Sequence, residues 1–179
     1  MKPFALLAIA VAANLPTLAQ AQHSAYAGQE TRDIKAISAD EVKQYQAGAG
    51  MGFARAAELN RYPGPMHVLE LADKLALTPE QRAATTKLMS EHKAEASAIG
   101  GKMVEAERIL DQLFANGKAD RAALAQQVSR VATLHGEYRL SHLDTHVRMR
   151  ALLSAEQVKR YSSLRGYDGV APGQHKSHH

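Results

Sequence analysis

The sequence predicts an all-α protein built as a long antiparallel helical hairpin, flanked by shorter helices and forming a curved, thin layer. Hydrophobic residues make up 45% of the chain but aromatic residues only 5%, and alanine supplies much of the apolar fraction, which favours a thin helical interior over a sandwich or barrel. No proline occurs between Pro79 and Pro172. Apolar residues in that stretch recur at steps of three or four, as they do on one face of a helix. Near the middle of the stretch, Asn116-Gly117 can adopt the left-handed backbone conformation that ends an α-helix.

Composition also limits the function classes. A chain of 179 residues fits one modest domain. The absence of cysteine excludes disulfides, a thiol nucleophile and cysteine-based zinc sites. A net charge of +4 falls short of the dense basic stripe of a nucleic-acid binder, so no nucleic-acid partner is expected. The chain has no GxSxG elbow, HExxH motif or phosphate loop, and we therefore expect no enzymatic activity.

The first residues have the pattern of a secretory signal peptide. Lys2 precedes an apolar run over 4–13, and Ala19-Gln20-Ala21 forms a small-residue cleavage site. The run is too short for the roughly 20 residues of a spanning helix. We therefore expect residues 1–21 to be removed and the remaining protein to reach the periplasm of a bacterium.

Residues 22–36 lack a sustained apolar period and are expected to be extended, before a single helical domain over 37–166. Ser38-Ala-Asp-Glu41 forms a capping box that predicts a helix over 39–47. Three glycines at 48, 50 and 52 end that helix, and a second short helix is expected over 53–60. The turn Tyr62-Pro63-Gly64-Pro65 then starts a helix over about 65–76, because proline suits the first helical position.

The proline-free stretch predicts the two arms of the hairpin, over 79–116 and 120–152, each roughly 50 to 55 Å long at 1.5 Å per residue. Gly100-Gly101 lies inside the first arm and is expected to bend it. A terminal helix is expected over 155–165, and a disordered, histidine-containing tail over 167–179. The first stripe consists of Leu88, Ala96, Ile99, Met103, Ala106, Leu110 and Leu113, and the second of Leu124, Val128, Val131, Tyr138, Met149 and Leu153.

Two matching pentapeptides precede predicted helices. The first is Leu77-Thr78-Pro79-Glu80-Gln81 and the second is Leu153-Ser154-Ala155-Glu156-Gln157. In each, the hydroxyl residue caps a helix and the glutamine reaches back from the third helical position, with each cap worth about 1 kcal/mol. Either copy alone is an ordinary capping box, whereas the pair is more specific.

With these two motifs the chain resembles the periplasmic LTxxQ-motif family, which comprises Spy-like and CpxP-like stress chaperones and related heavy-metal sensor and resistance proteins. The resemblance covers about residues 65–167. It implies an all-helical fold, a homodimer, and a concave surface that holds unfolded polypeptide without ATP. For the sensor branch it implies a membrane-bound signalling partner.

The residue pattern independently favours a binding protein. Long amphipathic helices in a thin layer cannot bury all their apolar area within one chain, so part of it must meet a second copy or a client. The alternatives for the candidate contact residues are ordinary core packing for methionine and a solvated helix face for the basic residues. The candidate client-binding residues are Met66, Met89, Met103, Lys87 and Arg108.

Histidines support a different interpretation, namely metal sensing or sequestration. His142 and His146 lie four residues apart on the same helical face as Met149. If the hairpin turns symmetrically about Gly117, His92 faces His142. The set of His92, His142, His146 and Met149 suits zinc, nickel or copper better than calcium. The alternative is that these histidines only fill space at the seam between the two helices. For His175, His178 and His179 in the tail, the sequence allows either loose metal binding or a flexible end without such a role.

Overall fold

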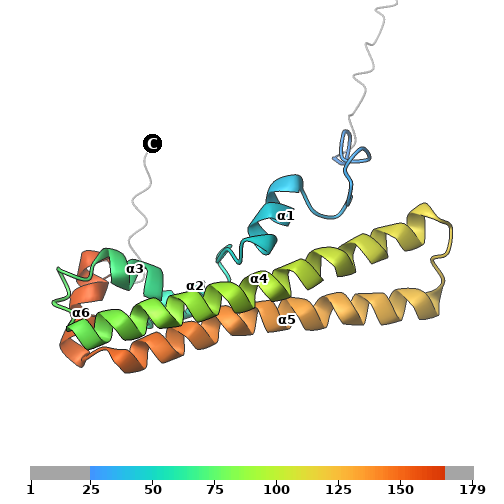
Figure 1. The fold of residues 1–179 in the computed structure, drawn as a ribbon. Helices are drawn as coiled ribbons and strands as arrows, with labels where there is room; N and C mark the ends of the chain where they lie inside the picture. Colours follow the sequence, from blue (N-terminus) through green and yellow to red (C-terminus); the bar gives the residue numbers. More distant parts are fainter. Residues whose placement is uncertain (1–24, 168–179) are drawn as a thin grey trace, which may run out of the picture.

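The computed structural model describes residues 25–167, and every regular element in that part of the chain is a helix, as predicted (Figure 1). Two long helices run side by side as a hairpin, and the short helices lie against it. The predicted signal peptide and the histidine-containing end of the chain fall outside the described residues. The helices are α1 (Ala39–Gln46), α2 (Arg55–Glu58), α3 (Pro65–Glu70), α4 (Pro79–Ala115), α5 (Arg121–Leu152) and α6 (Ala155–Leu164).

The hairpin has the predicted register. Gly117 adopts a positive φ of 64° in the turn between α4 and α5, a backbone conformation that costs glycine little. On the seam the ring centroids of His92 and His142 lie 4.5 Å apart, and the Gln127 side chain donates to the Ala106 carbonyl at 2.6 Å. Pairs on the two arms therefore face each other about a pivot near Gly117.

Helix starts follow the capping signals in the sequence. Ser38, Thr78 and Ser154 each accept a hydrogen bond from the backbone of the third helical residue, whose side chain returns one to the cap. The Asp120 carboxylate caps α5 by accepting from the Ala123 N–H at 2.9 Å. These side chains supply partners to backbone donors that a helix cannot satisfy within itself.

The segment before α1 differs from the prediction. Residues 25–37 form consecutive turns rather than an extended strand, with Gln29 N–H donating to the Tyr26 carbonyl at 3.0 Å. Ile34 is 2% exposed and packs in the core. Ion pairs from Asp33 to Arg108 and from Lys35 to Asp111 fix the segment to α4. A single isoleucine anchors the segment, and one apolar residue forms no periodic pattern. The local sequence therefore did not predict that this segment packs against α4.

Gly100 has a different role from the predicted bend. Helix α4 continues without a break through Gly100 and Gly101. A Cβ built at Gly100 would overlap the backbone carbonyl oxygen of Tyr45 at the end of α1, whereas one built at Gly101 has nothing within 4 Å. Gly100 therefore lets α1 approach the backbone of α4.

In the described residues, two clusters of buried apolar side chains form the core, at different positions along the hairpin. The first joins α3 and α6 to the hairpin where the two LTxxQ motifs meet, and it contains Val68, Leu75, Leu88, Met149 and Tyr161. The second lies under α1 and contains Ile34, Tyr45, Met103, Leu134 and Tyr138. Within the described residues no helix combines the length and hydropathy needed to span a bilayer.

Candidate functional site

A cavity of about 800 Å³ lies between the hairpin and the segment that connects α1 to α3. One wall is the glycine-rich stretch over 47–52, in which Gly48, Met51 and Gly52 all adopt positive φ. The opposite wall comes from α4 and α5. Among its lining residues are three methionines and four histidines: Met51, Met66, Met89, His67, His92, His142 and His146.

His92 and His142 meet at the base of this cavity, one from each arm of the hairpin. Their rings contact edge to face, and the two side chains are buried, with His92 8% and His142 4% exposed. The Nδ1 atom of His92 and the Nε2 atom of His142 are buried without a hydrogen-bond partner. Buried polar atoms are nearly always paired in proteins, so two orphaned nitrogens in one contact call for an explanation.

Aromatic side chains surround His142. The Phe53 ring stacks on it at a centroid separation of 6.2 Å, and the Tyr138 ring contacts it at 4.8 Å. The Tyr138 hydroxyl donates to the Ala49 carbonyl at 2.6 Å, which fixes the glycine-rich wall over the histidine. Burial, with a smaller contribution from Tyr45, raises the pKa of Tyr138 to about 12, so this hydroxyl keeps its proton at neutral pH.

The same enclosure affects the histidines. Burial, together with repulsion from His92 and His146, lowers the pKa of His142 to about 4. Burial also lowers the pKa of His92. Both rings are therefore neutral at neutral pH, and each keeps a nitrogen lone pair.

We expect the free energy of unfolding to fall as the pH drops from about 6.5 towards 4. In that window histidines of the unfolded chain bind protons, whereas the buried rings of the folded protein stay neutral. The folded state therefore loses stability as the pH falls. For each proton bound only by the unfolded chain, the loss is about 1.4 kcal/mol per pH unit. Urea unfolding across this range measures the effect. The slope should decrease in His142→Phe and stay unchanged in His135→Phe, since His135 is exposed on the same helix. Equal slopes in all three proteins would contradict this account.

His146 belongs to a different set of contacts. Its Nδ1 lies 2.7 Å from the Tyr62 carbonyl, to which it must donate, and 3.7 Å from a Glu58 oxygen. Glu58 also accepts from the hydroxyls of Tyr161 at 2.5 Å and Tyr167 at 3.0 Å. This carboxylate joins α2, the proline turn, α5 and the end of α6.

The predicted metal set is assembled only in part. His92 and His142 are in contact as predicted, but Met149 is fully buried in the first core cluster and does not line the cavity. Across residues 25–167, no group of three or more His, Cys, Asp or Glu side chains is placed to hold a metal ion. Periodicity correctly put Met149 on the inward face of α5, but that face is closed by α3 and α6 at this level.

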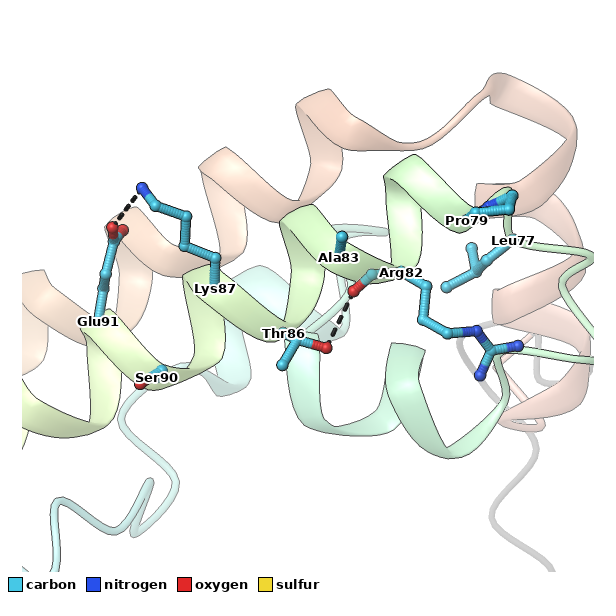
Figure 2. Close-up of a pocket in the computed structure, with 8 residues that line it drawn as sticks. All are labelled: Leu77, Pro79, Arg82, Ala83, Thr86, Lys87, Ser90 and Glu91. Carbon is cyan, nitrogen blue, oxygen red and sulfur yellow. Dashed lines mark hydrogen bonds and ion pairs between the residues drawn. The ribbon is translucent and has the colours of Figure 1, made fainter.

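The predicted client-binding residues do not form one surface in the structure. Met66 is 48% exposed and Met89 half-buried, and both line the cavity. Met103 is 3% exposed in the second core cluster, so its placement on a binding surface was wrong. Lys87 lies on a shallow outer face of α4, where it pairs with Glu91 at 2.6 Å (Figure 2). Arg108 is engaged by Asp33.

Several residues of the site escaped sequence reasoning. Glu58 lies in a four-residue helix, and Phe53 in the loop before it, where no periodic pattern exists. Met51 is one of the adaptable methionines of the sequence, but the glycines around it predict a helix break rather than a place in the cavity wall. The alternation of glycine with small residues was the one available signal that this backbone approaches another element closely.

Fold and site together define an all-helical hairpin protein, in which paired capping motifs close one end and an apolar, histidine-containing cavity lies beside the seam. The family model for heavy-metal resistance proteins matches residues 45–160, well over half of the chain. The protein therefore belongs to the heavy-metal resistance family, as its LTxxQ motifs indicated. No curated protein and no solved structure matches the chain.

Proposed function

We propose that this protein is a periplasmic, ATP-independent, chaperone-like protein that binds apolar segments of unfolded polypeptides. The observation that carries the proposal is the open, largely apolar cavity of about 800 Å³ with flexible methionines on its walls. Unbranched thioether side chains adapt to partners of different shape, which suits a binder of many sequences. Signal-peptide export, a homodimer and the absence of catalysis remain predictions that accompany this proposal.

In this proposal a client enters at the rim of the cavity. Leu59 is 58% exposed and Met66 is 48% exposed, and both line the cavity. Lys93 and Arg55 line it as well, so an apolar segment that carries acidic residues would find complementary charge at the edge.

We expect the purified protein to suppress aggregation of a chemically unfolded client at near-stoichiometric ratio, as measured by light scattering. Leu59→Glu combined with Met66→Glu should reduce suppression several-fold, because carboxylates at the rim oppose entry of apolar side chains. Ile109→Glu is the matched control, since Ile109 is 41% exposed on α4 but does not line the cavity. No suppression at tenfold excess of wild-type protein would refute the proposal, and equal loss in the control would refute the location.

A second candidate function is binding of a heavy-metal ion, as the family name suggests. The specific observation in its favour is the pair of orphaned nitrogens on His92 and His142. Calorimetric titration of the full chain with zinc, nickel and copper tests it, with His142→Phe as the variant that should lose binding. In a sensor, a membrane-bound signalling partner would read the metal-bound state.

A further inference from the structure

We propose that His92, His142 and Met89 form a low-coordinate site for a soft monovalent cation, Cu(I) or Ag(I). The proposal rests on the second candidate function and narrows it, because it assigns the metal by charge, softness and coordination number. It also replaces the sequence-derived ligand set, from which Met149 is excluded by its place in the core.

The donor set argues against a divalent ion. Zinc in protein sites is almost always bound by four ligands, drawn from cysteine, histidine and carboxylate side chains, with water completing catalytic sites. The described part of the chain gathers no three such side chains around one point. The carboxylate nearest in sequence to His92, Glu91, is bound instead to Lys87 and Arg148 on the outer face. A divalent ion at the histidine pair would lack ligands.

A soft monovalent ion needs fewer donors, and the cavity offers the right kind. Soft thioether sulfur is a good ligand for Cu(I), and imidazole also suits copper. Met89 precedes His92 by three residues on α4, so the two side chains are neighbours on one helical face. Both line the cavity together with His142, and Met51 and Met66 on the opposite wall provide further sulfur atoms.

The state of the two rings favours binding. His92 Nδ1 and His142 Nε2 are already free of hydrogen bonds, so metal binding breaks no existing interaction at these atoms. The Phe53 and Tyr138 rings contact the His142 ring, so His142 has an apolar surrounding on these sides.

The experiment titrates the full-length protein with silver nitrate and, under anaerobic conditions, with Cu(I) in competition with a chromogenic Cu(I) chelator. We expect one tight site. Because loss of an outer-shell partner alone typically costs about 10–100-fold in affinity, removal of a ligand in His142→Phe or His92→Phe should cost at least about a hundredfold. His135→Phe is the control and should bind as wild type, with the same tail histidines present in every variant.

Met89→Leu distinguishes this site from a general imidazole site, and it keeps the proposal testable if the buried histidine variants fail to fold. X-ray absorption of the Cu(I) complex should show sulfur together with imidazole nitrogen, and the sulfur contribution should decrease in Met89→Leu. Zinc and nickel titrations are run in parallel. Tight zinc or nickel binding that depends on His142, without Ag(I) or Cu(I) binding, would overturn this proposal and leave the metal function standing. Absence of all metal binding at the pair would overturn both, and an all-nitrogen Cu(I) spectrum would overturn the methionine assignment.

Discussion

Replacing Gly100 with alanine is expected to destabilise the protein by about 2 kcal/mol or more, although alanine is the better helix former by about 1 kcal/mol. The added methyl group would overlap the Tyr45 carbonyl oxygen, and a backbone atom cannot rotate away as a side chain can. Relief requires α1 to separate from α4, which would expose part of the second core cluster. Urea unfolding followed by circular dichroism gives the change in free energy.

Gly101→Ala is the matched control for this prediction. The position lies in the same helix, and nothing lies within 4 Å of the added Cβ. This variant should gain up to about 1 kcal/mol. Two adjacent glycines should therefore respond to one substitution with opposite signs. If both variants gain stability, the close approach of α1 to α4 is not a feature of the folded protein in solution.

Alanine at Gln81 or Gln157 is expected to cost about 2–3 kcal/mol of unfolding free energy, because each amide does more than cap its own helix. The two side chains form reciprocal hydrogen bonds, both 2.9 Å long. Gln81 Nε2 also donates to the Leu152 carbonyl at 2.9 Å, and Gln157 Nε2 to the Leu75 carbonyl at 3.3 Å. Removal of one amide deprives the other of one donor and one acceptor in a partly buried place, and it also leaves a backbone carbonyl without its side-chain donor.

The double variant should therefore lose less than the sum of the two single losses, by about 1 kcal/mol. Gln126→Ala, at an exposed position of α5, controls for loss of a glutamine and should change stability little. Strict additivity of the two single losses would mean that the motifs act as separate capping boxes and that their contact contributes nothing.

Helices and register were predictable because they depend on short-range signals. Capping at Ser38, Thr78 and Ser154 fixed where helices start, and the turn at Gly117 fixed which positions of the arms face each other. The contact between His92 and His142 follows from that symmetry alone. Sequence thus supplied the hairpin and half of the candidate site.

The other half depends on the segment before α3, where tertiary contacts decide the structure. Ile34 and Phe53 are single apolar residues among turns, so no period marks them as buried. Met103 and Met89 lie on the same long helix, but Met103 is covered in the second core cluster, whereas Met89 lines the cavity. Glu58 likewise acquires its partners from three other parts of the chain, namely the proline turn, α5 and the end of α6.

Tyr167 limits how far the protein can be trimmed from its carboxyl end. Its hydroxyl binds Glu58 and its side chain lines the cavity, so a version cut after this tyrosine removes the tail histidines yet leaves the pocket's wall in place. A version cut before it takes away a hydrogen-bond donor and opens that wall to solvent. The tail histidines can therefore be removed without disturbing the interior only if the cut falls after Tyr167.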